Sequence, residues 1–146
     1  MPYLLDTNHC IYLMNGSEKT ENDLSTFEHN TIEMVHIFRN EPCYMSEVSL
    51  GELYYGVAFS NMKEHNFNKI ALFRESVLTL SLDTNIWMLF GETKAYLRKQ
   101  GKTITDFDLL IACTAKTYNL ILVTNDSDFE VLPESFERVN WAGKER

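Results

Sequence analysis

The sequence predicts one α/β domain with a mainly parallel central sheet flanked by helices. Short apolar runs rich in β-prone residues alternate along the chain with longer stretches of helical periodicity, the pattern of a sheet built from β–α units. The length of 146 residues suits a single compact domain, and a hydrophobic share of 45% is enough for an ordinary core. The expected domain covers residues 1–146.

The first quarter of the chain predicts two strands separated by two helices. Tyr3–Leu5 is a short apolar run typical of a buried strand, and Thr7–Met14 carries a loose helical stripe that a turn signal then stops. A second, irregular helix is expected over Leu24–Arg39. A proline follows it, and Cys43–Met45 is short and apolar enough to be the second strand.

The middle of the chain predicts two more helices and a strand. Ser46 is a suitable N-cap for a helix that runs to Phe59, in which Gly51 and Gly56 would permit close packing. A further amphipathic helix is expected over Asn66–Leu78, and Thr79–Leu82 alternates as a strand does.

The last third predicts two helices and two strands. Asp83 caps a long helix that ends near Gly101, and a second helix runs over Thr105–Tyr118. Leu120–Val123 is a pure apolar β-prone run and the clearest strand in the sequence. A short final strand is expected near Glu137–Asn140.

Charge and cysteine content restrict the class of protein. The formal net charge of −8 argues against a general nucleic-acid binder; it fits an acidic, cation-collecting site or, more commonly, a solvated acidic face. Cys10, Cys43 and Cys113 are far apart with apolar neighbours, which indicates reduced thiols in a cytoplasmic protein. The sequence has neither a signal-peptide pattern nor an apolar run long enough to cross a membrane.

Several acids follow the predicted strands and could meet at one edge of the sheet. Asp6 comes directly after the first strand, Asp126 follows Leu120–Val123, and Asp108 lies in the first turn of the helix that starts at Thr105. Parallel strands place their carboxyl ends on one edge, where ligands of α/β proteins bind. These acids are therefore candidates for one shared site.

Helical geometry leaves two choices of acid open. Glu47 and Glu52 lie on one predicted helix, roughly 140° apart around its axis at 3.6 residues per turn. Asp106 and Asp108 are separated by roughly 160° in the same way. Only one acid of each pair is expected to face a common site.

Each acid also has a purely structural explanation. Asp6 could simply cap the first helix, and Asp108 could complete a capping box with Thr105. Asp126 and Asp128 could stabilise a turn with their side chains.

A convergent set of carboxylates would favour a divalent cation, because the anions repel one another until a cation neutralises them. Carboxylates without Cys or His fit Mg²⁺ or Mn²⁺ better than Zn²⁺. Such a cation can assist hydrolysis of a phosphodiester.

Four segments and the end of the chain together resemble the PIN domain, and specifically the VapC-type toxins of bacterial type II toxin–antitoxin systems. The segments are Leu5–Asn8, Ser46–Gly56, Gly101–Ala112 and Leu122–Phe129, and the usual ending is similar to Asn140–Trp141. Each motif is weak by itself, but four in order at suitable separations are fairly specific. A phosphatase of the haloacid dehalogenase type is disfavoured, because Asn8 stands where its second Asp would be.

The resemblance implies a twisted, PIN-like parallel sheet and a defined set of site residues. It selects Glu52 over Glu47 and Asp108 over Asp106. The implied metal-binding, catalytic carboxylates are Asp6, Glu52, Asp108 and Asp126, with Asp128 as the alternative to Asp126. The implied supporting residues are Thr7, Asn8 and Thr124.

The resemblance also implies an activity and partners. The activity is Mg²⁺- or Mn²⁺-dependent endoribonuclease cleavage, often of tRNA, leaving a 5′-phosphate and a 3′-hydroxyl. A VapB-type antitoxin and a homodimer are expected. The alternatives are a regulatory, DNA-binding partner of the antitoxin with little or no turnover, or an interaction module whose acids only cap helices.

An acidic ribonuclease must still hold RNA, and the densest basic group of the sequence is a candidate for this contact. It consists of Lys94, Arg98, Lys99 and Lys102. The same residues could instead complement the dipole at the end of their helix. His9 lies close to Asp6 in the chain, where it can line the cleft or simply pack in the core.

Overall fold

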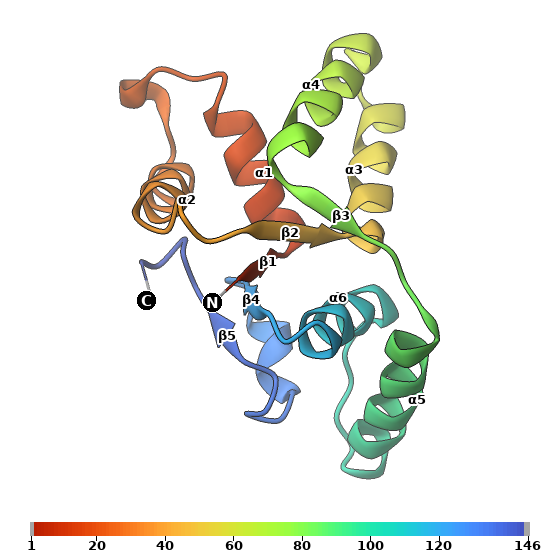
Figure 1. Ribbon diagram of the computed structural model, residues 1–146. Coiled ribbons are helices and arrows are strands. Elements are labelled where there is room, and N and C mark those ends of the chain that lie inside the picture. Colours follow the sequence, from red (N-terminus) through yellow and green to blue (C-terminus); the bar gives the residue numbers. More distant parts are fainter. Residues whose placement is uncertain (1, 145–146) are drawn as a thin grey trace.

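A five-stranded sheet runs through the centre of the computed structural model, which describes residues 2–144 (Figure 1). Its order is β3-β2-β1-β4-β5, and every neighbouring pair is parallel. The strands are β1 (Tyr3–Leu5), β2 (Cys43–Ser46), β3 (Leu78–Leu80), β4 (Ile121–Val123) and β5 (Arg138–Val139). The predicted α/β class with a parallel sheet is confirmed.

Helices cover both faces of the sheet, with α1–α4 on one side and α5 and α6 on the other (Figure 1). The α-helices are α1 (Thr7–Gly16), α2 (Thr26–Ile37), α3 (Glu47–Phe59), α4 (Lys63–Ser76), α5 (Thr84–Lys99) and α6 (Asp106–Thr117). The 3₁₀ turns are η1 (Glu21–Asp23) and η2 (Ser127–Val131).

The two-residue period of the strands divides the core into two parts. Leu4 and Leu122 point to the face that packs against α5 and α6. Leu5, Met45 and Val123 point to the opposite face, where they meet residues of α1, α2, α3 and α4. Strands buried on both faces explain why their sequences read as continuous apolar runs.

The strand register brings the ends of β1, β2 and β4 to within one residue of one another. Leu5 pairs with Met45 on one side and with Val123 on the other, so the residues that follow all emerge at the same edge of the sheet. The chain order reverses between β1 and β4, which makes this edge a topological switch point, where parallel sheets open a crevice.

The predicted helix starts are confirmed where a side chain caps them. Ser46 accepts a hydrogen bond from the Val48 N–H, Asp83 from the Ile86 N–H, and Thr105 from the Asp108 N–H. The bounds expected for the fourth helix were wrong, because α4 covers Lys63–Ser76. Met62 precedes it without a side-chain cap, so no start signal marked the first, polar turn.

The end of α4 was also misplaced, since Leu78 belongs to β3. The residue before it, Val77, is extended and buried, and Leu78 pairs with Tyr44 of β2. Pairing with the sheet, which a helical apolar pattern does not reveal, therefore decides where this helix stops.

The expected packing role of Gly51 and Gly56 was wrong. A Cβ atom added at either position would meet no atom within 4 Å. Both glycines face open space on α3, at the pocket described below.

No helix among the described residues is long and apolar enough to cross a membrane. The three cysteines are free thiols, with Cys10 and Cys113 buried and Cys43 partly buried. Burial raises the pKa of Cys43 to about 11 and that of Cys113 to about 12. These thiols are therefore protonated at neutral pH, consistent with the reduced cysteines expected from the sequence.

Candidate active site

Asp6 stands at the carboxyl end of the central strand and begins α1. Its backbone N–H donates to the Val123 carbonyl at 3.0 Å, which ties the ends of β1 and β4 together. Its side chain is the N-cap of α1 and accepts the His9 N–H at 2.8 Å. The residue is only 4% exposed, so the capping explanation is correct and the carboxylate is also held at the switch point.

Glu52 approaches from the second turn of α3 and is held by the residue after Asp6. The Thr7 hydroxyl donates to Glu52 Oε1 at 2.7 Å and lies 3.1 Å from the hydroxyl of buried Ser49. This contact joins the starts of α1 and α3 and orients the Glu52 carboxylate.

Three further acids gather beside them. Carboxylate oxygens of Asp108, Asp126 and Asp128 all lie within 4.8 Å of one another. Asp126 caps η2 by accepting the Asp128 N–H at 2.9 Å, and its own N–H donates to the Thr124 hydroxyl at 3.1 Å. The turn expected from Asp126 and Asp128 thus exists, and it brings both acids to Asp108.

The environment of Asp108 reflects this crowding. Burial raises the pKa of its carboxyl group most, and the negative charges of Asp126, Glu52 and Asp128 raise it further. A hydrogen bond with Thr105 acts in the opposite direction. The raised pKa means that ionised Asp108 lacks a compensating positive charge in the protein alone.

One open pocket of about 640 Å³ collects acids from four separate segments. Asp6, Glu52, Asp108 and Asp126 all line it. The remaining lining residues are Thr7, Asn8, Ile11, Gly51, Tyr55, Gly56, Phe107 and Phe129. We call it the acidic pocket.

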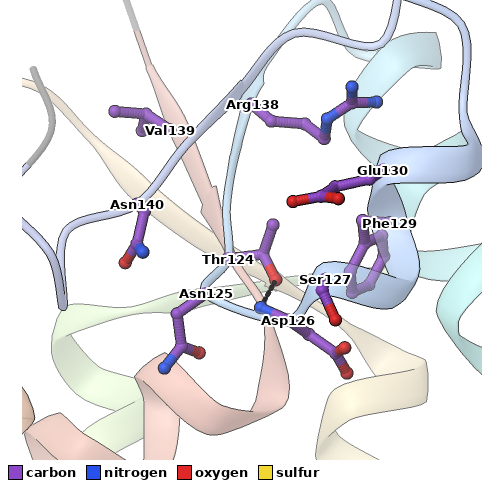
Figure 2. A pocket seen from close by; sticks show the side chains of 9 residues that line it. All are labelled: Thr124, Asn125, Asp126, Ser127, Phe129, Glu130, Arg138, Val139 and Asn140. Carbon is purple, nitrogen blue, oxygen red and sulfur yellow. Dashed lines mark hydrogen bonds between the residues drawn. The ribbon is translucent and has the colours of Figure 1, made fainter.

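A smaller pocket of about 250 Å³ is lined by the loop after β4, the start of η2 and the region of β5. Figure 2 shows the Thr124 hydroxyl bound to the Asp126 N–H, with the Asp126 carboxylate at the edge of this pocket. Arg138 is the cationic residue among its lining side chains. Asp126 and Phe129 line both pockets, so the two are neighbours.

The structure also places the two acids that helical geometry left as alternatives. Glu47 Oε1 accepts the Leu82 N–H at 2.7 Å, and Asp106 Oδ1 lies 2.8 Å from the Lys94 ammonium. Neither lines the acidic pocket, whereas Glu52 and Asp108 do.

The predicted basic group lies along the end of α5 and the loop before α6. Lys94, Arg98 and Lys102 line a narrow hollow of about 110 Å³. Lys94 also lies over the Phe90 ring and pairs with Asp106, two residues before Asp108. The ion pair therefore links Lys94 to the start of the helix that carries Asp108. It also neutralises part of the positive charge of the basic group.

Sequence reasoning missed the roles of Ser49, Tyr55 and Phe107 at this site. Tyr55 and Phe107 are 70% and 56% exposed, and both line the acidic pocket. The available signal was their distance from a site acid on the same helix, since Tyr55 follows Glu52 by three residues and Phe107 directly precedes Asp108. His9 does not line the pocket; it is fully buried behind Asp6.

The donor set fits a divalent cation that prefers oxygen ligands. The pocket offers carboxylates, hydroxyls and an amide, and no thiol or imidazole is among its lining residues. Close carboxylates with a raised pKa are stabilised when a cation neutralises them.

A family profile described as PIN domain matches residues 3–135. Ribonuclease VapC2 of Rickettsia felis is 32% identical over 134 residues, which cover 91% of this chain and 93% of the relative. The tRNA(fMet)-specific endonuclease VapC of Shigella flexneri is 30% identical over 139 residues, 95% of this chain and 92% of the relative.

A solved structure has the same fold. It is described as VapBC2 from Rickettsia felis bound to a DNA fragment from their promoter, and the match has a TM-score of 0.80 and 31% identity. The match covers 97% of this chain and 99% of the other. The family match over residues 3–135 includes every segment that lines the acidic pocket.

Proposed function

The chain belongs to the PIN-domain family, within its VapC group, and we propose that it is a divalent-metal-dependent endoribonuclease of a toxin–antitoxin pair. The observation that carries the proposal is the meeting of Asp6, Glu52, Asp108 and Asp126 in one pocket at the switch point of the sheet. Caps alone would not require acids from four segments to face the same space.

In this proposal Mg²⁺ or Mn²⁺ is held by Asp6, Glu52, Asp108 and Asp126, directly or through water. Asp128 shares the cluster with Asp108 and Asp126 and is the alternative ligand on this side. A bound cation supplies Lewis-acid stabilisation of charge that develops on the phosphodiester oxygens during hydrolysis.

The neighbouring side chains would hold these acids and the substrate in place. Thr7 orients Glu52 through its 2.7 Å hydrogen bond, and Thr124 supports the Asp126 backbone. Asn8 lines the pocket and can contact substrate or water. Exposed Tyr55 and Phe107 offer flat faces on which bases of single-stranded RNA can stack.

We extend the proposal to the substrate and partner. A relative is named as a tRNA(fMet)-specific endonuclease, which makes tRNA the first substrate to test. A related structure contains VapBC2 with promoter DNA, which supports a VapB-type antitoxin as partner of this chain. A homodimer remains part of the proposal.

That same complex favours a second candidate function. As part of an antitoxin complex, the chain would take part in regulating its own promoter with little or no turnover. With a net charge of −8, the chain would leave most DNA contacts to the antitoxin.

The proposed activity is tested by incubating purified protein with tRNA in Mn²⁺, in Mg²⁺ and in excess chelator. We expect cleavage with either cation, products that carry a 5′-phosphate, and no cleavage in chelator. Asp6→Asn should lower the rate by at least about 100-fold, because several kcal/mol of charge stabilisation depend on the ligand set, at tenfold per ~1.4 kcal/mol.

The folded state of the variant must be checked by its circular dichroism spectrum and thermal melt. Full activity of folded Asp6→Asn, or undiminished cleavage in chelator, would falsify the metal-site proposal. A chain that never cleaves RNA but shifts promoter DNA together with its antitoxin would support the regulatory candidate instead.

A further inference from the structure

We propose that His9 is a positioning residue that fixes the Asp6 carboxylate in the orientation needed to bind the cation. The inference rests on the proposed function, because it takes Asp6 as a metal ligand. It concerns a residue outside the acidic pocket, with no direct contact to substrate.

Both hydrogen-bond donors that reach the Asp6 carboxylate within the described chain come from His9. The His9 backbone N–H and the ring Nδ1 each lie 2.8 Å from the same oxygen, Asp6 Oδ1. Capping the helix requires only the first of these bonds. The second adds a directional contact on that oxygen, and among residues 2–144 no donor reaches Oδ2.

The second ring nitrogen determines which tautomer His9 adopts. The Ala142 backbone N–H donates to His9 Nε2 at 3.3 Å, so Nε2 must be the acceptor. Nδ1 therefore carries the hydrogen and donates it to Asp6 Oδ1. The ring is completely buried, so water cannot replace either contact.

Contacts with Ala142 and Tyr12 fix the orientation of the imidazole. Ala142, whose N–H donates to Nε2, accepts at its own carbonyl oxygen a hydrogen bond from the Asn30 side chain at 2.7 Å. The rings of Tyr12 and His9 also pack edge to face, with centroids 5.4 Å apart. A path of hydrogen bonds thus runs from α2 through the end of the chain to Asp6.

The consequence is an Asp6 carboxylate with one oxygen occupied and the other available to the pocket. Rotation of the carboxylate would break the Nδ1 bond, so His9 keeps Oδ2 presented to the cation. Partners that orient a ligand in this way typically contribute about 10- to 100-fold to metal affinity or activity.

Two substitutions separate the two contacts of the ring. In His9→Asn, the side-chain amide occupies the place of Nδ1 and can still donate to Asp6, while the contact with Ala142 is lost. In His9→Gln, the amide reaches the place of Nε2 and can accept from Ala142, while the donor to Asp6 is lost. The two variants are therefore matched controls for each other.

Mn²⁺ affinity of the metal-free wild type, His9→Asn and His9→Gln is measured by isothermal titration, with thermal melts without metal alongside. We expect His9→Gln to weaken binding by about 10- to 100-fold. His9→Asn should stay within about threefold of the wild type even where its melting temperature falls, since only an intact Asp6 contact preserves the affinity. Long-range ¹H–¹⁵N spectra of the wild type should show hydrogen on Nδ1 of His9.

Equal affinity in all three proteins would overturn the inference and leave the metal site intact. The inference would also be overturned if Mn²⁺ affinity fell in both variants in proportion to their melting temperatures, because His9 would then act only through packing of the core. Hydrogen on Nε2 would contradict the assigned contacts. A wild type that binds no Mn²⁺ at all would instead remove the proposed function, and the inference with it.

Discussion

Asp108 is the residue at which the crowding of the acidic pocket has a consequence for stability. Burial and three neighbouring carboxylates raise its pKa. The folded state therefore binds this proton more tightly than the unfolded chain does. Ionised Asp108 lowers the free energy of unfolding at pH above the raised pKa, and this penalty disappears as pH falls below the unfolded value.

We predict that Asp108→Asn raises the melting temperature of the metal-free protein at pH 7 while it abolishes RNA cleavage. The gain should shrink as pH is lowered through the pKa of Asp108, because the wild-type carboxyl group then becomes protonated as well. Thermal melts of both proteins across this pH range measure the effect.

Asp106→Asn is the matched control for this substitution. Asp106 lies two residues earlier on the same helix and forms an ion pair with Lys94, whereas Asp108 lies among other acids. Removing the charge of Asp106 should therefore not raise the melting temperature. A lower melting temperature for metal-free Asp108→Asn at pH 7 would mean that repulsion at the site is not what limits stability.

Individual residues also show how far the sequence alone could predict the site. The angles around a helix indicated that only one of Glu47 and Glu52 could face the pocket, but not which one. The choice depends on β3 and the loop after it, where the Leu82 N–H binds Glu47. The role of His9 could not be predicted, because its partner Ala142 lies 133 residues further along.

Among the elements, the end of α5 and the loop after it carry the basic group that we expect to contact RNA. We predict that the double substitution Arg98→Gln, Lys99→Gln weakens RNA binding at low salt. It should also flatten the dependence of log affinity on log salt by about one unit for each lost phosphate contact. RNA binding measured over a series of salt concentrations, in a protein made inactive by Asp6→Asn, checks this.

Lys116→Gln provides the comparison on the same pair of packed helices. Lys116 lies in the last turn of α6, roughly 12 Å along the helix axis from Asp108 at 1.5 Å per residue, and donates to the Ser135 carbonyl. It should leave the salt slope unchanged. An unchanged slope in the Arg98, Lys99 variant would assign these charges to the helix dipole alone.

Elements with their own local signals were the predictable part of the fold. The structure confirmed the expected N-caps, which are Ser46, Asp83 and Thr105. It also confirmed a strand in the apolar run that forms β4. The predicted bounds of α4 were wrong at both ends. Its start has no side-chain cap, and its end depends on the pairing of Leu78 with Tyr44. Local patterns do not contain such long-range contacts.

For the whole molecule, alternation of strands and helices was sufficient to predict a parallel α/β sheet. It did not predict that β1 lies in the middle, or that the register brings the ends of β1, β2 and β4 to within one residue of one another. The residues that follow these strands meet because of that register. The extent of a single domain over residues 1–146 stays a prediction.

We predict that the protein unfolds in one cooperative transition and that Mn²⁺ raises its midpoint. A ligand at about 100 times its dissociation constant adds about 2.7 kcal/mol to the free energy of unfolding, which amounts to several degrees for a chain of this size. Calorimetry with and without Mn²⁺ measures both properties. Two transitions would contradict the single domain, and an unmoved midpoint would count against a cation site.

The most direct test of the central claim, that the acids of the pocket perform the reaction, compares two pairs of acids in one cleavage assay. Initial rates of tRNA cleavage at saturating Mn²⁺ are measured for the wild type, Glu52→Gln, Glu47→Gln, Asp108→Asn and Asp106→Asn. Glu52→Gln and Asp108→Asn should each lose at least about 100-fold in rate. Glu47→Gln and Asp106→Asn should stay within a few-fold of the wild type. Equal losses within each pair, or full activity of folded Glu52→Gln and Asp108→Asn, would contradict the proposed site.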